Sequence, residues 1–131
     1  MQIQSIKNNG ITIALIESEQ CLIHDPQSAL DLLINVKYET GCTSLAINKE
    51  AFTPDFFVLS TCLAGEILQK FINYGIRLAI YGDFPQYTSK PLKDFIYECN
   101  CGKNVYFQLN SQAAIDKLSS ASLKRKKSYE R

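Results

Sequence analysis

The dipeptide Asn9-Gly10, placed between two short apolar runs, constrains the fold of this chain more than any other feature of its sequence. Asn-Gly favours the left-handed backbone of a two-residue turn and is the strongest short-range signal for a β-hairpin. The flanking runs predict strands near residues 2–6 and 11–16. The chain therefore opens with two antiparallel strands, and the rest of the fold must build on them.

Helix signals follow the hairpin. Asp25 can cap a helix that begins at Pro26, carries an apolar stripe with a 3.6-residue period and stops before Gly41, which predicts helix 26–40. Thr53 with the proline behind it repeats this entry signal and predicts the longest helix, about 20 residues that end at Gly75. Further segments predict strands near 43–48, 76–82 and 104–109 and helices near 89–102 and 111–120.

This alternation predicts a single α/β domain over residues 1–118. A mostly parallel, mixed sheet of about five strands and about four helices would be joined by right-handed crossovers. Residues 119–131 hold five Lys/Arg and one Glu without apolar periodicity, which indicates a basic, disordered tail. Such a tail could make weak contact with nucleic acid, but the body lacks the basic and aromatic pattern of a nucleic-acid-binding surface.

Composition supports one globular domain, since the 131 residues are 46% hydrophobic and 21% charged. No apolar stretch approaches the roughly 20 residues that a bilayer requires, and the N-terminal residues lack the apolar core of a signal peptide. We therefore expect a cytoplasmic protein without membrane partners. Five cysteines, an odd number, favour reduced thiols over a disulfide framework.

The thiols do not predict a metal or redox centre. Cys99 completes the apolar stripe of its helix, so we interpret it as a core residue. The one combination with zinc-like spacing would join Cys21 and His24 to Cys99 and Cys101, and we favour small structural thiols over such a site. We expect neither a metal nor a cofactor.

No catalytic residues are predicted. The chain contains no G-x-G-x-x-G, no G-x-S-x-G and no phosphate-binding loop. His24 precedes a helix start and is better explained as a loop histidine than as a general base.

The carboxyl end of the sheet is the expected place for a ligand, because open α/β sheets bind ligands there. The loops 48–50 and 82–89 predict a speculative small-ligand site, and its residues would be Lys49, Asp83, Tyr87, Thr88 and Ser89. The alternative is that Asp83, Thr88 and Ser89 cap turns and the following helix.

The predicted long helix suggests a partner surface. Its large apolar residues from Phe56 to Tyr74 share one face, which could cover the sheet. The opposite face predicts a surface for a protein partner or a second copy of the chain, formed by Val58, Thr61, Cys62, Gly65, Gln69 and Ile72. The alternative is that the closing helix covers this face.

The segments "VKYETGC", "LAGEILQKFINYGIRLAIYGDF", "TSKPLKDFIYECNCGK" and "AAIDKL", in this order, resemble the small bacterial family called domain of unknown function 4180. The resemblance covers about residues 2–118 and implies a fold group, but no activity and no catalytic residues.

A second, weaker resemblance is to STAS domains of the anti-sigma-factor-antagonist type. It implies that the helix after the third strand docks a partner, and that an Asp-Ser at the start of this helix is phosphorylated. Here the matching stretch is Thr53-Pro54-Asp55-Phe56, with phenylalanine where the serine would be. Only Thr53 could take over that role.

Two functions follow as alternatives. The sequence favours a non-enzymatic, STAS-like protein-interaction or regulatory module, with homodimerisation as one form of interaction. The alternative is a small-ligand-binding protein or small enzyme that uses Lys49, Asp83 and Tyr87 at the carboxyl end of the sheet.

Overall fold

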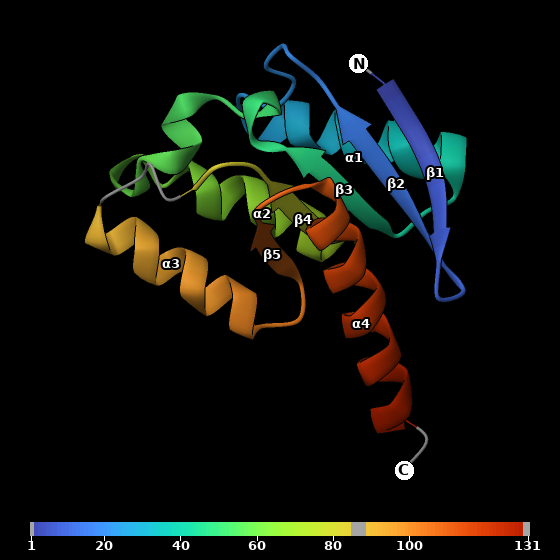
Figure 1. Cartoon of the computed structure of the whole chain (residues 1–131). Coiled ribbons are helices and arrows are strands. Elements are labelled where there is room, and N and C mark those ends of the chain that lie inside the picture. Colours follow the sequence, from blue (N-terminus) through green and yellow to red (C-terminus); the bar gives the residue numbers. More distant parts are fainter. Residues whose placement is uncertain (1, 85–88, 130–131) are drawn as a thin grey trace.

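The fold is a mixed five-stranded sheet with helices on both faces, as the sequence predicts (Figure 1). The computed structural model describes residues 2–84 and 89–129, with side chains up to residue 120. The elements in chain order are β1 (Gln2–Asn8), β2 (Ile11–Glu17), α1 (Pro26–Thr40), β3 (Ser44–Asn48), the 3₁₀ turns η1 (Lys49–Ala51), η2 (Pro54–Phe57) and η3 (Leu59–Thr61), α2 (Leu63–Asn73), β4 (Arg77–Tyr81), α3 (Lys90–Cys101), β5 (Val105–Gln108) and α4 (Ser111–Tyr129).

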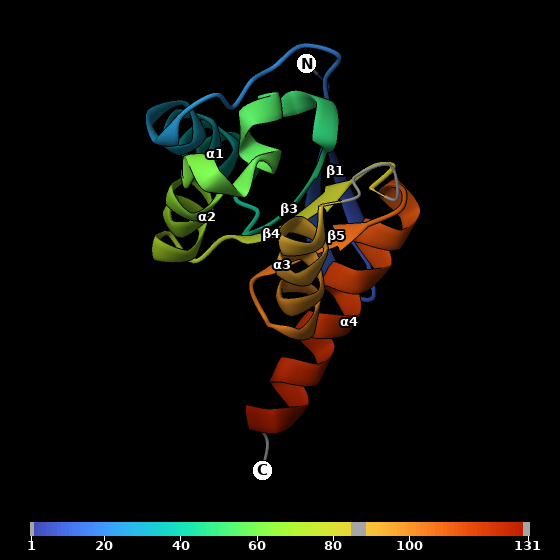
Figure 2. The same ribbon diagram turned by 90° about the vertical axis from the view of Figure 1, so that its left-hand side faces the viewer.

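The strand order in the sheet is β1-β2-β3-β4-β5, the same as the order along the chain. The β1–β2 hairpin is antiparallel, and the three following pairs are parallel. Because every parallel connection steps in the same direction and crossovers are right-handed, α1, α2 and α3 all lie on one face. Figure 2 shows these helices on one side of the sheet and α4 on the other.

The two faces of the sheet are packed differently. Branched and aromatic side chains such as Ile47, Ile80 and Phe107 cover the face under α1, α2 and α3. The other face carries Ala46 and Ala79 on its central strands, and both are fully buried under α4. Small side chains at these positions let the helix lie close to the sheet, so a single helix can cover most of this face.

The ends of α1 are those that the sequence predicts. The Asp25 carboxylate accepts a hydrogen bond of 2.7 Å from the Ser28 N–H, and the Ser28 hydroxyl lies 3.1 Å from the Asp25 N–H. This capping box lowers the pKa of Asp25, chiefly through the hydrogen bond from the Ser28 backbone. Gly41, with φ of 71°, ends the helix in the left-handed conformation that glycine adopts without strain.

The predicted long helix is wrong in its first half. The chain forms η2 and η3 between residues 54 and 61, and α2 begins only at Leu63. Val58 is extended, with φ of −103° and ψ of 99°, and Cys62 is left-handed, with φ of 62°, so a continuous α-helix is interrupted twice. The longest helix is α4 with 19 residues, and Gly65 stands in the first turn of α2 instead of the middle of a helix.

The reason for the interruption is an aromatic cluster. Phe52, Phe56 and Phe57 are all buried, and the Phe56 ring centroid lies 4.6 Å from that of Phe52 and 4.9 Å from that of Phe57. Phe56 and Phe57 both lie in η2, and both are buried in this cluster. The free energy gained by burying both rings favours the interrupted backbone over a continuous helix.

The closing helix does not cover α2. It packs on the opposite face of the sheet, mainly against β4, β3 and β5. Its backbone continues to Tyr129 through most of the segment 119–131, for which the sequence predicts disorder; the division of the chain at residue 118 stays a prediction. Among the described residues, no helix combines the length and the apolar character needed to cross a membrane.

Candidate functional site

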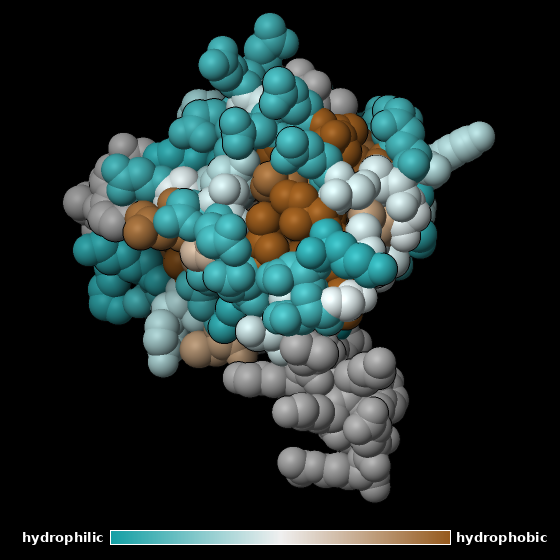
Figure 3. Space-filling view, turned by 45° about the vertical axis from the view of Figure 1, so that its right-hand side comes forward, coloured by the Kyte–Doolittle hydropathy of each residue, from teal (hydrophilic) through white to brown (hydrophobic). Residues whose placement is uncertain are grey.

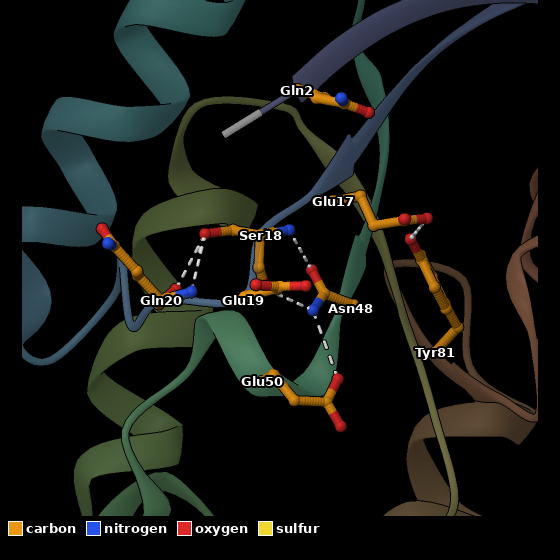
Figure 4. A pocket seen from close by; sticks show the side chains of 8 residues that line it. All are labelled: Gln2, Glu17, Ser18, Glu19, Gln20, Asn48, Glu50 and Tyr81. Carbon is orange, nitrogen blue, oxygen red and sulfur yellow. Dashed lines mark hydrogen bonds between the residues drawn. The ribbon is translucent and has the colours of Figure 1, made fainter.

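A cavity of about 680 Å³ lies at the end of the sheet where β2, β3 and β4 have their carboxyl ends (Figure 4). β1 runs in the opposite direction, so its first residue reaches the same end of the sheet. The cavity is lined by Gln2, Glu17, Ser18, Glu19, Gln20, Asn48, Glu50 and Tyr81. Parallel strands place their carboxyl ends together, which explains why residues far apart in the chain meet here.

Asn48 holds the two main walls of this cavity together. Its side-chain oxygen accepts a hydrogen bond of 2.9 Å from the Ser18 N–H, and its amide nitrogen donates to the Ser18 carbonyl at 2.6 Å. The same nitrogen lies 3.2 Å from a carboxylate oxygen of Glu50. Asn48 is buried, and these contacts use both of its polar atoms, so it acts as a structural clamp between the β2 loop and the end of β3.

Tyr81, the last residue of β4, is buried and lines this cavity. Its hydroxyl lies 3.2 Å from a carboxylate oxygen of Glu17 and 3.3 Å from the Ile16 carbonyl. Burial, with the negative charges of Glu17 and Glu50, raises the pKa of Tyr81 far above its usual value. The phenol therefore stays protonated at neutral pH and serves as a hydrogen-bond donor, not as a base.

The electrostatic character of the cavity is negative. Glu17, Glu19 and Glu50 contribute carboxylates, and none of the lining residues is a lysine, arginine or histidine. In the described part of the chain, no group of three or more His, Cys, Asp or Glu is arranged to hold a metal ion. The lining residues include neither a thiol nor an imidazole, so the ionisable side chains of the cavity are the three carboxylates and the Tyr81 phenol. The arrangement can attract a cation.

The residues predicted as a ligand site are only partly brought together. Lys49 is buried, and its ammonium donates a hydrogen bond of 2.8 Å to the backbone carbonyl of Asp83, while the ammonium lies 6.0 Å from the centre of the Phe84 ring. Ser89 accepts from the Leu92 N–H at 3.5 Å as the N-cap of α3. Tyr87 and Thr88 lie outside the described residues. Ligand binding by these five residues stays a prediction.

Gly82 explains how Lys49 reaches this position. The φ of Gly82 is 156°, and a Cβ built there would lie 2.7 Å from both Cγ and Cδ of Lys49. Any larger residue would displace the lysine stem from the end of β4. Lys49 thus packs over the strand end, beside Asp83 and away from the glutamate-lined cavity, whose lining includes neither residue.

The sequence predicts only a small part of this cavity. Its loop 48–50 belongs to the predicted ligand site, whereas Glu17, Ser18 and Tyr81 do not. Their common signal is position, because Glu17 ends β2, Tyr81 ends β4, and the register pairs Tyr81 with Asn48. That signal becomes readable only when the strand order is known, since Tyr81 otherwise looks like an ordinary core aromatic.

The thiols and the histidine form no common site. Cys99, predicted to be a core residue, is partly buried and packs against the core from its margin; burial raises its pKa to about 11, with Glu98 adding to the shift. Cys21, Cys62 and Cys101 are exposed, and Cys42 is buried. His24 is exposed, and its Nδ1 lies 3.3 Å from a carboxylate oxygen of Asp25. Within the described residues, Cys21, His24, Cys99 and Cys101 do not form a group that could hold a metal ion.

The residues predicted for a partner surface are all on the outside of the molecule. They come from two local structures: the first three belong to the 3₁₀ region and the left-handed residue before α2, and the others to α2 itself. The exposed set comprises Val58, Thr61, Cys62, Gly65, Gln69 and Ile72. Their exposure is compatible with a partner surface, and their role stays a prediction.

Comparison with known proteins places the chain in a family. Residues 8–118 match the family described as Domain of unknown function (DUF4180); the match covers the hairpin turn, strands β2 to β5 and the first part of α4, and includes only the last residue of β1. No curated protein and no solved structure matches the chain. The matched segment spans most of the 131 residues and agrees with the family resemblance that the sequence motifs indicate. The chain therefore belongs to the DUF4180 family.

Proposed function

We propose that this protein is a non-enzymatic interaction module that binds a protein partner through the outer sides of α1 and α2. The observation that carries this proposal is a concentration of exposed large hydrophobic side chains. Of the seven such residues among the described side chains, four belong to these two helices or directly follow them: Ile34 (46% exposed), Tyr38 (81%), Ile72 (38%) and Tyr74 (42%). We call these four residues the α1–α2 surface.

The packing of the two helices supports a shared surface. α1 and α2 contact each other side by side over one face of the sheet, and no described element lies outside them (Figures 1 and 2). Exposed Val58 and the small residues Cys62 and Gly65 adjoin the start of α2. Aromatic and aliphatic side chains beside small residues suit a protein interface, because they supply contact area where another chain can approach closely.

The fold class and the resemblance to STAS domains also support binding of a protein partner through α2. In STAS domains the helix after the third strand docks a partner, and here α2 follows β3. The phosphorylation switch of that family has no direct counterpart, because the segment from Thr53 forms a 3₁₀ turn and not the start of the helix. We therefore propose docking through α2 without the serine switch.

The test compares two charge substitutions on exposed hydrophobic residues. Ile72→Glu is expected to abolish capture of the native partner by the tagged full-length protein, because it places a charge in the α1–α2 surface. Tyr97→Glu on α3 is the matched control and is expected to retain the same partner, which is identified by mass spectrometry. Both variants should melt within about 2 °C of the wild type, since exposed positions contribute little to stability.

Gly65→Arg provides a second probe, placed on α2 outside the four residues of the α1–α2 surface, and it should not disturb the fold because a Cβ at Gly65 would meet nothing within 4 Å. A partner that is retained by both Ile72→Glu and Gly65→Arg would contradict the proposal. Equal loss with Tyr97→Glu would also contradict it, since that result would indicate a general effect of surface charge.

A second candidate function is the binding of a small cationic ligand in the glutamate-lined cavity. Its volume of about 680 Å³ is within the usual range for small-molecule sites, and its carboxylates favour an amine. We rank this candidate second because every described buried side-chain polar atom already has a hydrogen-bond partner within the protein. The described residues therefore offer no unsatisfied buried polar group that a ligand would be needed to pair.

The ligand candidate is tested by titration of the full-length protein with 1,4-diaminobutane, followed by NMR amide shifts. Binding should perturb residues 17–20 and 48–50, and Glu19→Gln should weaken it several-fold because one carboxylate is lost. Glu39→Gln on the exposed side of α1 is the control. Absence of shifts up to millimolar diamine would remove amine binding as a function.

A further inference from the structure

The two edges of the sheet are protected very differently. At the β5 edge, the Asn100 side-chain oxygen accepts a hydrogen bond of 2.7 Å from the Phe107 N–H and lies 3.4 Å from the Gln108 side-chain nitrogen. α3 packs beside this strand. A helix and a side-chain acceptor thus occupy the place where another strand would pair, which is a common way to prevent edge-to-edge association.

The peptide groups of β1 point alternately toward β2 and away from the sheet. The two turn residues are both left-handed, with φ of 55° at Asn9 and 79° at Gly10, and the register pairs Asn8 with Ile11. In a two-residue hairpin these flanking residues form a hydrogen-bonded pair, and every second residue before them does the same. Gln2, Gln4, Ile6 and Asn8 therefore direct their peptide groups toward β2.

The remaining residues of β1 direct their N–H and C=O groups outward. These residues are Ile3, Ser5 and Lys7. β1 has β2 as its one neighbour in the sheet, and no other hydrogen bond within the described part of the chain reaches these peptide groups. The outer edge is therefore a row of three unpaired donor–acceptor sites.

The usual protection of an exposed edge is missing from β1. The strand contains no proline, and its register with β2 is uninterrupted over all seven residues, so there is no bulge. Lys7, near the turn, is its one charged residue. An unprotected, regular edge of this length is a template for pairing with another strand.

We propose that β1 pairs antiparallel with β1 of a second copy of this chain, so that one continuous sheet runs through both copies. A two-fold axis near Ser5 would bring Ser5 opposite Ser5, and Ile3 of each copy opposite Lys7 of the other. These three facing pairs would form about six backbone hydrogen bonds. The antiparallel arrangement keeps the two Lys7 side chains apart, whereas a parallel one would place like charges side by side.

The side chains next to this edge support a second copy as the occupant. On the α4 face of the hairpin, Ile6, Ile11 and Leu15 are only partly buried. Figure 3, which views the side of the molecule with β1 forward, shows a hydrophobic area surrounded by hydrophilic residues. Pairing of the two β1 edges alone would bury less than the roughly 800 Å² of surface per partner that is typical of a stable interface. Partial burial of this apolar area by the second copy would increase the buried surface.

Amide hydrogen exchange of the full chain tests the pairing directly. In the dimer, the amides of Ile3, Ser5 and Lys7 should be protected at high protein concentration and should lose protection on dilution, in step with the mass from light scattering. Those of Gln4 and Ile6 should stay protected throughout, because they bond to β2. Fast exchange of the outward amides at every concentration, or a monomer throughout, would overturn the proposal.

Variants at Ser5 provide the second test. Ser5→Pro removes an outward N–H and is expected to raise the dimer dissociation constant more than about tenfold. The two-fold axis places Ser5 of both copies at the interface, so two backbone hydrogen bonds are lost. Ser5→Thr retains the peptide group and should retain the dimer. If Ser5→Pro does not fold, Ser5→Asp replaces it, since two carboxylates would face each other at the axis. A dimer that survives these changes but dissociates with Ile72→Glu would assign self-association to the α1–α2 surface and overturn the proposal.

Discussion

Phe56→Ala is expected to lower the free energy of unfolding by about 3–5 kcal/mol, the usual cost of truncating a buried phenylalanine. Phe56 is 1% exposed and touches two aromatic neighbours, with ring centroids 4.6 Å from Phe52 and 4.9 Å from Phe57. The residue sits in η2, where no regular helix or sheet ladder would hold the backbone after the ring is lost. Urea unfolding followed by circular dichroism measures the change.

Val58→Ala is the matched control for this prediction. Val58 lies two residues away in the same region but is 49% exposed, so its truncation should change stability by less than about 1 kcal/mol. Equal effects of the two substitutions would show that Phe56 is not the centre of the core in this segment. The turns between β3 and α2 would then need another source of stability.

Asn48→Asp is expected to destabilise the fold by about 2–4 kcal/mol at neutral pH. The amide nitrogen of Asn48 donates to the Ser18 carbonyl and to Glu50, and a carboxylate cannot donate to either. The new charge would also be buried beside an existing carboxylate, without a cation among the residues that line the cavity. Chemical unfolding at several pH values measures the loss.

The pH dependence of this variant has a definite sign. Burial, the Ser18 carbonyl and Glu50 all favour the protonated form of an aspartic acid at position 48, so its pKa is raised in the folded state. The folded variant then binds more protons than the unfolded chain, and its deficit relative to wild type shrinks as the pH falls toward the unfolded pKa. A deficit that stays constant or grows on acidification would contradict the clamp role of Asn48.

Asn35→Asp is the control for Asn48→Asp. Asn35 is an exposed residue of α1 with the same side chain. Its replacement should change stability by less than about 0.5 kcal/mol and should show little dependence on pH. The comparison separates the effect of an added negative charge from the loss of the buried donor.

Local chemistry explains how much of this fold could be predicted. The Asn9-Gly10 turn, the Asp25 capping box and the stop at Gly41 act within a few residues, and each occurs where the sequence predicts it. Strands β3, β4 and β5 are short apolar runs that alternate with helices along the chain, and the right-handed crossover then predicts a parallel sheet. These signals need no knowledge of the tertiary structure.

The segment between β3 and α2 shows where local chemistry is insufficient. The entry signal at Thr53 and Pro54 is typical of a helix, yet the chain forms 3₁₀ turns because both Phe56 and Phe57 are buried in one cluster. The free energy of burying two aromatic rings exceeds the modest helical preference of these residues. The outcome depends on Phe52 and the neighbouring core, which no local window includes.

The hairpin, the two caps of α1, the α/β alternation and membership of the DUF4180 family can all be predicted from the amino-acid sequence, because each rests on residues close together in the chain or on their order. The cavity shared by Glu17, Asn48 and Tyr81 becomes visible only in the three-dimensional structure, as does the packing of Lys49 beside Asp83 and outside that cavity. The three-dimensional structure also shows that one sheet edge is closed by Asn100 while the β1 edge is open. The physical reason is that cavities and edges depend on strand order and register, which arise from packing between distant segments.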